Sequence, residues 1–275
     1  MLEIVNEMMA YPFMQKAILV GLLISICAAL LGVSLVLKRY SMLGDGLSHV
    51  GFSILSVSTA FGLSSPLYIS IPGVIITAII LLKVGNSKKM KADSSIALIA
   101  SSALAIGVAV TSMTTGLNTD VCNFMFGSLL AMTNTDVNLS IIISILVVLL
   151  FIVYYRKIFI ITFDEDFAKA SGLKVSKYTS LIAILAAVVI VVGMRMMGTL
   201  LISSIIIFPA LTSMRLFRTF KQVITSSVIV SIVSFLVGIF LSYVYEISSG
   251  ATIVLVNLAM FTIFSLLNVI LSKEK

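Results

Sequence analysis

Long, uninterrupted apolar runs constrain the fold more than any other feature of this sequence. They are about 17–24 residues long, and short polar clusters separate them. About 20 apolar residues carry an α-helix across the hydrocarbon core of a bilayer, so each run predicts a transmembrane helix. With 60% hydrophobic and 11% charged residues, the chain has no polar stretch long enough for a soluble catalytic domain. The sequence therefore predicts an all-α fold, a polytopic transmembrane helical bundle.

The predicted spans follow these runs in chain order, after a short amphipathic lead-in over 1–14. The stretch Asp120–Met132 is too short to cross and is expected to be interfacial or re-entrant. The apolar segment 199–214 contains Pro209, which is expected to break it, so eight or nine spans remain open. A kink is expected at Pro72-Gly73. The other spans are predicted at 15–37, 42–63, 67–82, 94–113, 137–155, 178–194, 223–244 and 251–271.

The positions of the charges argue against nucleic acid as a partner, although the net charge is +7. Lysines and arginines gather in short clusters between the apolar runs, as cytoplasmic loops require. If the Lys38-Arg39 loop is cytoplasmic and nine spans alternate, only Lys16 and Arg195 of the 18 basic residues lie outside. The sequence thus predicts a multi-pass membrane protein, in contact with lipid, with an outer N-terminus and an inner C-terminus.

One apolar run contains the only histidine of the chain, in the motif Gly44-Asp45-Gly46-Leu47-Ser48-His49. Asp45 and His49 are four residues apart, so a helix places them on one face. Carboxylate and imidazole are both good ligands for zinc and other first-row divalent metals. Ionisable groups inside a membrane span are costly and usually line a substrate pathway. These residues predict a permease for a divalent metal, with Asp45 and His49 as metal ligands.

Two ligands do not complete a tetrahedral site, so the remaining ligands must come from elsewhere in the chain, a second subunit or water. Asp120, Glu246, Ser203, Ser204 and the methionines are candidates, none of them singled out. If the helix continued from Arg39 at 1.5 Å per residue, His49 would lie roughly 15 Å deep, near the midplane. The competing interpretation is a polar pair that only holds helices together.

Other kinds of site find little support. A Gly-x-x-x-x-Gly-Lys-Ser/Thr phosphate loop is missing, so the chain is not expected to be an enzyme or to hydrolyse ATP itself. Cys27 and Cys122 are expected to be core residues without a disulfide. Met194, Met196 and Met197 are expected to pack, and Gly193 and Gly198 to flank a turn. Glu3 and Glu7 precede the first apolar run, which is therefore expected to be retained rather than cleaved.

The segment Asp164–Gly172 is the one distinctly polar internal stretch. Acids at its front, Lys169 near its end and Gly172 after it are typical of a short capped helix. From the residues alone, a solvated connection is favoured over a helix that docks on a partner.

Four segments resemble the membrane subunit of bacterial ABC importers for zinc, manganese or iron. They are Gly44–Phe52, Phe126–Ala131, Asp164–Gly172 and Gly198–Leu216, and the resemblance extends over nearly the whole chain. Met125 stands where a leucine is more usual, a difference of little consequence. Because His49 is followed by Val50-Gly51-Phe52, the motif looks more like the zinc-type members, and zinc is favoured over manganese.

The resemblance implies an ABC-importer permease fold in the bacterial inner membrane, with 1–275 as a single transmembrane permease domain. It implies a homodimer, a cytoplasmic ABC ATPase subunit, and an extracellular metal-binding lipoprotein that delivers the substrate. Metal is then the transported substrate and not a permanent cofactor, and Asp45 and His49 contact it in the channel. The polar segment becomes the helix that couples to the ATPase, which replaces the solvated-loop interpretation. Its residues are Asp164, Glu165, Asp166, Phe167, Ala168, Lys169, Ala170, Ser171 and Gly172.

Three rival functions stay open on the sequence. A gradient-driven secondary transporter or channel would work without an ATPase. A membrane scaffold would use the polar pair only for packing. An importer of a metal chelate would need a wider, more aromatic path, and the chain contains no tryptophan.

Overall fold

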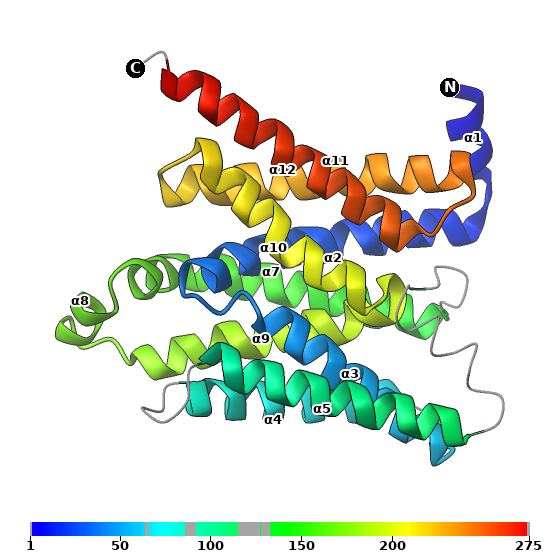
Figure 1. Ribbon diagram of the computed structural model, residues 1–275, viewed down its shortest axis with the longest axis horizontal. Helices are drawn as coiled ribbons and strands as arrows, with labels where there is room; N and C mark the ends of the chain where they lie inside the picture. The colour runs from blue at the N-terminus through cyan, green and yellow to red at the C-terminus, as the bar shows by residue number, and fades with distance from the viewer. Residues whose placement is uncertain (1, 64–65, 86–91, 115–126, 128–132, 274–275) are drawn as a thin grey trace.

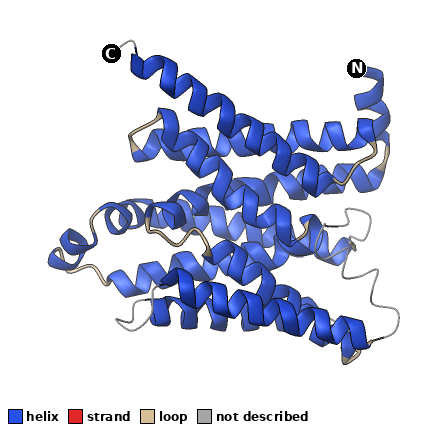
Figure 2. Cartoon of the chain, in the orientation of Figure 1, coloured by secondary structure: helices blue, strands red, loops and turns tan. Residues whose placement is uncertain are grey.

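The predicted all-α membrane bundle is confirmed. The computed structural model describes residues 2–63, 66–85, 92–114, 127 and 133–273, and every regular element in these ranges is a helix (Figure 2). Eight of the described helices are long and apolar enough to cross a membrane. In chain order the helices are α1 (Leu2–Ala10), α2 (Pro12–Leu37), α3 (Leu43–Ala60), α4 (Pro66–Gly85), α5 (Ala92–Met113), α7 (Asn134–Phe163), α8 (Glu165–Ala170), α9 (Val175–Met197), α10 (Thr199–Leu216), α11 (Phe220–Tyr245) and α12 (Ser249–Lys273).

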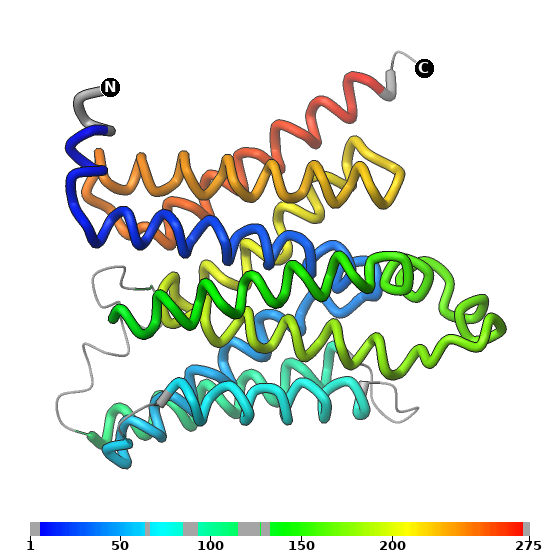
Figure 3. The backbone as a smooth tube through the Cα atoms, turned by 180° about the vertical axis from the view of Figure 1, so that it is seen from behind, coloured from blue at the N-terminus to red at the C-terminus, as the bar shows by residue number. Residues whose placement is uncertain are grey.

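The long helices run alternately in opposite directions, and the two chain ends lie at opposite ends of the bundle (Figure 1). Helix α8 and the C-terminus are at one end, and α1 and the N-terminus are at the other, as the view from behind also shows (Figure 3). The end that carries α8 also holds the Lys38-Arg39 turn after α2. This arrangement agrees with the topology expected from the charges, in which α8 is cytoplasmic.

Helix α3, which contains Asp45 and His49, is the least apolar of the long helices. It is 18 residues long, yet it is not among the eight candidate spans, because Asp45, His49 and its glycines and serines lower its mean hydropathy. It begins at Leu43 after a turn, and the chain between Lys38 and Met42 is not helical. The depth calculated for His49 at the helical rise from Arg39 therefore does not apply.

The expected break at Pro209 is wrong, because α10 continues through this proline from Thr199 to Leu216. Helix α4 likewise continues through Pro72. A proline removes one hydrogen bond of the helix, and neighbouring helices, side chains and small local adjustments compensate for it in membrane bundles. Segment 199–214 is thus a membrane-length helix and one of the eight candidates.

Helix α7 is longer than expected. The sequence predicted an end near Tyr155, where Arg156-Lys157 follows, but the helix continues to Phe163. Arginine and lysine are good helix formers. The apolar residues Ile158 and Ile161 beyond them are buried, and this burial stabilises the extra turns. At 1.5 Å per residue, a helix of 30 residues spans about 45 Å, more than the roughly 30 Å of a bilayer core. Its last turns therefore project beyond the membrane and carry α8.

Small residues allow close approach between the helices. A Cβ atom at Gly32 of α2 would overlap the backbone carbonyl of Ile206 in α10, and one at Gly238 of α11 would lie 2.5 Å from Ile253 of α12. Glycine at such crossings is typical of membrane bundles, because helices in lipid associate through van der Waals packing rather than through the hydrophobic effect.

Several smaller expectations are also decided. Met194, Met196 and Met197 are all buried, as packing residues should be. Gly198 forms the α9–α10 turn with φ of 83°, a conformation that glycine adopts without strain. Gly193 does not flank this turn but lies inside α9 against Ile202. Cys27 is buried and unpaired; Cys122 and the segment Asp120–Met132, apart from Gly127, lie outside the described residues.

Candidate functional site: an aspartate–histidine pair on α3

The first turns of α3 bring Asp45 and His49 together. His49 Nε2 lies 3.7 Å from Asp45 Oδ1, as expected for positions i and i+4 of one helix. The Asp45 side chain is 43% exposed and that of His49 is 21% exposed. Both side chains are therefore partly exposed, on a helix that is otherwise largely buried.

The remaining residues of the motif fasten α3 to its neighbours. Ser48 Oγ donates to the carbonyl of Asp45 at 2.7 Å and lies 3.4 Å from Ser203 Oγ of α10. A Cβ atom at Gly46 would lie 2.6 Å from Ile96 of α5, and one at Gly51 equally close to Met194 of α9. Three helices therefore hold the back of α3, and this packing determines the direction in which Asp45 and His49 face.

The distance within the pair is close to what a shared metal requires. Ligand bonds of about 2.0–2.2 Å at a tetrahedral angle separate two donor atoms by roughly 3.3–3.6 Å, slightly less than the 3.7 Å observed. In the described part of the chain no third His, Cys, Asp or Glu joins the pair. His49 Nδ1 is buried there without a hydrogen-bond partner, although a histidine that binds metal usually donates from its second nitrogen.

The other candidate ligands differ in how near they lie to Asp45 and His49. Ser203 is linked to it through Ser48, whereas Ser204 Oγ bonds to the carbonyl of Leu201 within α10. Glu246 caps the end of α11 in an exposed turn, and α3 packs mainly on α4, α5, α9 and α10. Asp120 lies outside the described residues.

The polar segment after α7 forms the short capped helix that its sequence predicts. Asp164 accepts a hydrogen bond from the Phe167 amide at 2.8 Å, and Gly172 follows the helix with φ of 79°. One face of α8 is anchored by Ala168, which is fully buried. Phe167, in contrast, is 58% exposed, an unusual exposure for an aromatic side chain outside the membrane spans.

The first residue of α8 pairs with one lysine of the same helix and with one from the turn after α2. Glu165 pairs with Lys169 at 3.1 Å and with Lys38 at 3.3 Å, and Lys38 also donates to the carbonyl of Ile161. Partial burial favours the neutral acid, but the hydrogen bonds and charges of Lys169 and Lys38 outweigh it and lower the pKa of Glu165. The hydrogen bond to Glu165 and the charge of Glu165 in turn raise the pKa of Lys169.

A partly buried ion pair at the opposite end of the bundle was missed by the sequence analysis. Asp136, at the start of α7, accepts from Arg195 of α9 at 2.8 Å and also closes a capping box with Thr133. Nearby, Lys16 donates to Asn134 at 2.7 Å. A signal was available, because Lys16 and Arg195 are the two basic residues assigned to the outer side and each needs a polar partner.

The sequence matches a known family over almost its full length. Residues 10–268 correspond to the ABC 3 transport family. The chain is 28% identical to the manganese transport system membrane protein MntC of Halalkalibacterium halodurans, covering 94% of this chain and 88% of the relative. It is 30% identical to the high-affinity zinc uptake system membrane protein ZnuB of Haemophilus influenzae (92% and 97%) and 32% identical to a probable iron transport system membrane protein of the same organism (94% and 94%).

A solved structure shows the same fold. The structure of PsaBC from Streptococcus pneumoniae in complex with Fab contains a chain that superposes with a TM-score of 0.85 at 28% identity, covering 95% of this chain and 94% of that one. The similarity therefore extends over all the long helices and not only over the motifs. The chain belongs to the ABC 3 transport family and is a multi-pass permease subunit of the bacterial plasma membrane, not an enzyme.

Proposed function

We propose that this chain is the permease subunit of an ATP-driven importer for a divalent transition metal, and that Asp45 and His49 hold the metal in transit. The observation that carries the proposal is the geometry of this pair. A carboxylate and an imidazole face the same partly open space at 3.7 Å, on a buried helix of a membrane bundle. Such groups are costly inside a membrane and usually serve a pathway.

The incomplete ligand set supports a homodimer as the working unit. A transition metal needs about four ligands, and Asp45 with His49 supplies two from one protomer. A second copy that meets the first across this open face would contribute an equivalent pair, with water completing the shell as needed. Two ligands per protomer also suit a carrier, because a metal held by a complete rigid site would be released slowly.

Helix α8 is the proposed contact with a cytoplasmic ABC ATPase. It lies at the cytoplasmic end of the bundle, and it presents Phe167 and the carboxylate of Asp166, which is 97% exposed, away from its anchored face. An exposed aromatic side chain with charges around it is a typical anchor for a protein partner. ATP-driven movement of the two ATPase subunits would then act on α7 and α9, the helices that flank α8.

The proposed cargo is a first-row divalent cation, with zinc as the first candidate because of Val50-Gly51-Phe52 after His49. The relatives named above are described as transporting manganese, zinc and iron, so all three metals belong in the test. An extracellular metal-binding lipoprotein is the proposed source of the metal. Zinc binds nitrogen and oxygen ligands more tightly than manganese or ferrous iron does.

Metal uptake in cells that lack their own importers tests this proposal. The chain is expressed with its ATPase and binding protein, as wild type and as Asp45→Asn, His49→Gln and Asp93→Asn. Asp93 is an exposed acid in the first turn of α5 and serves as the matched control. Loss of one metal ligand commonly costs more than tenfold in affinity. Uptake of one of the three metals is expected to fall at least that much in the two α3 variants and to stay unchanged in the control.

Two outcomes would contradict the proposal. Undiminished uptake in both α3 variants would remove Asp45 and His49 from the metal path. Uptake that continues with an ATPase unable to hydrolyse ATP would instead support a gradient-driven carrier or channel.

A further inference from the structure

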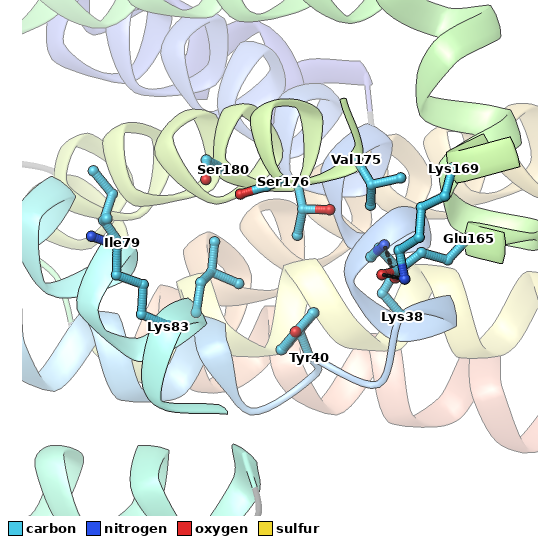
Figure 4. Close-up of a pocket in the computed structure, with 11 residues that line it drawn as sticks. Lys38, Tyr40, Ile79, Lys83, Glu165, Lys169, Val175, Ser176 and Ser180 are labelled. Atoms are coloured by element: carbon cyan, nitrogen blue, oxygen red, sulfur yellow. Dashed lines mark hydrogen bonds and ion pairs between the residues drawn. The ribbon is translucent and has the colours of Figure 1, made fainter. Parts of the chain in front are cut away.

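A pocket of about 200 Å³ opens at the cytoplasmic end of the bundle, apart from Asp45 and His49 (Figure 4). The turn after α2, the end of α4, the start of α8 and the start of α9 all contribute to it. Its basic lining residues are Lys38, Lys83 and Lys169, and Glu165 is its one acid. Three lysines against one glutamate leave two formal positive charges, so the pocket repels a divalent cation and attracts an anion.

The basic groups lie at the two ends of the pocket. Lys38, Glu165 and Lys169 are gathered at one end, and the side chain of Lys83 lies toward the other (Figure 4). The Lys38 side chain is only 7% exposed and is held by Glu165 and the carbonyl of Ile161. Lys83 has no carboxylate partner among the residues that the structure describes. One lysine of the pocket therefore remains available to a bound anion.

Donors on α9 face the space between these ends. Ser176, Thr179 and Ser180 line the pocket, and Thr179 Oγ1 is buried without a hydrogen-bond partner in the described part of the chain. Leaving a buried hydroxyl unpaired costs about 1–3 kcal/mol, so a missing acceptor is implied. Helix α9 also begins here, and no side chain caps its N-terminal amide groups. Such a helix end favours a negative charge.

We infer that this pocket binds the phosphate group of an anionic phospholipid from the inner leaflet. Its position at the ends of membrane spans places it at the level of the head groups, where basic pockets between helices recognise anionic lipids. Its lining is also amphipathic: Ile79, Leu82 and Val175 lie beside the charged and hydroxyl groups. Free phosphate would use only the polar part, whereas a phospholipid uses both. A lipid held here would join α4 to the α8–α9 corner.

Two substitutions test whether these side chains bind a ligand or only stabilise the fold. Lys83→Gln removes a charge that supports no ion pair in the described structure. Thr179→Val removes a hydroxyl that has no partner, so without ligand it should leave the thermal stability unchanged or slightly raised. Lys177→Gln is the matched control, because Lys177 is an exposed lysine of the same helix that does not line the pocket.

The experiment measures retained lipid by native mass spectrometry of the purified permease–ATPase complex, supplied with phosphatidylglycerol or phosphatidylcholine. A thermal-shift titration with inorganic phosphate runs in parallel. Phosphatidylglycerol is expected to be retained over phosphatidylcholine, equally in the wild type and in Lys177→Gln. Its retention should fall about fivefold in Lys83→Gln, since one basic residue at an anionic surface contributes about that factor. Thr179→Val should reduce it by a similar factor, because it removes one hydrogen bond to the phosphate. Equal retention in all variants, or none in the wild type, overturns the proposal. Stabilisation by inorganic phosphate alone, lost in both pocket variants, overturns the lipid and leaves a soluble anion as ligand.

Discussion

At the scale of single residues, this chain uses its few charges in pairs. Asp136 and Arg195 connect α7 to α9 at the outer end, and Glu165 and Lys38 connect α8 to the turn after α2 at the inner end. Asp45 differs from these acids because its one ion-pair partner in the described residues is His49, at 3.7 Å, a distance too long for a hydrogen bond. This difference distinguishes a candidate transport site from structural ion pairs.

Replacing Asp136 with alanine is expected to destabilise the protein strongly. The substitution leaves Arg195 without its partner and also removes the capping box at the start of α7. Removing one partner of a partly buried charged hydrogen bond costs about 1–3 kcal/mol, which thermal unfolding of the purified protein would detect. The double variant Asp136→Ala/Arg195→Ala should lose less than the sum of the single variants. Asp93→Ala, an exposed first-turn acid, is the control, and an equal loss there would contradict the role of the ion pair.

Acidification is expected to loosen α8. The pKa of Glu165 is held below its ordinary value of 4.5, so the stability it contributes is complete above that pH and is lost as the pH falls through the lowered value. Hydrogen exchange of the α8 amides, corrected for intrinsic rates, should accelerate in that acidic window. Glu165 is half-exposed, so the change should not exceed about fivefold.

Glu165→Gln should already show the faster exchange at neutral pH and little further change on acidification. Asp166→Asn serves as the control, because Asp166 is almost fully exposed. A pH response that persists in Glu165→Gln would assign the effect to another group.

At the scale of elements, α2 approaches the backbone of α10 more closely at Gly32 than any other described glycine approaches the backbone of a neighbouring segment. At Gly32 a side chain would meet the backbone of Ile206, which no rotamer change can relieve, whereas at Gly51 it would meet the flexible end of Met194. The two glycines therefore predict different costs for the same substitution.

Gly32→Ala is expected to lower the free energy of unfolding by about 2–3 kcal/mol, near the upper range for overpacking, because α10 must move away. Gly51→Ala should cost less, since Met194 can adopt another rotamer. Thermal unfolding of both variants would measure the difference. An equal or reversed order would mean that the contact between α2 and α10 yields more easily than that between α3 and α9.

At the scale of the whole molecule, the topology rests on whether α3 crosses the membrane. Its composition alone does not place it among the candidate spans, yet its direction alternates with that of its neighbours, and the two chain ends are separated as nine crossings require. Polar residues on a crossing helix are tolerated when neighbouring helices cover them, and α3 is covered by α4, α5, α9 and α10.

Cysteine labelling would test this topology in intact cells, in a background with Cys27→Ala and Cys122→Ser. Phe61→Cys and Glu246→Cys lie in exposed turns that nine crossings place outside, and both should react with an impermeant maleimide. Asp166→Cys on α8 should react only after the membrane is made permeable. Labelling of Phe61→Cys from the inside alone would show that α3 does not cross.

The sequence by itself determined the class of fold, most of the spans and the polar pair. Apolar runs of this length have one stable solution in a bilayer, and residues four apart share a helix face whatever surrounds them. The capped helix α8 was predictable for the same reason, because Asp164 and Gly172 act locally. The extension of α7 to Phe163 was not, because it depends on burial of Ile158 and Ile161 against other elements.

Only the tertiary structure decided which helices meet and which charges pair. Asp136 is 59 residues from Arg195 and Lys38 is 127 from Glu165, so nothing local connects them. The continuity of α10 through Pro209 also depends on its neighbours, because packed helices compensate for the hydrogen bond that proline removes. The pocket of Lys38, Lys83 and Lys169 likewise exists only where four separate segments end at one level of the bundle. Packing between segments that are far apart in the sequence determines these features. The hydrophobic pattern of each segment does not show which other segments it will contact.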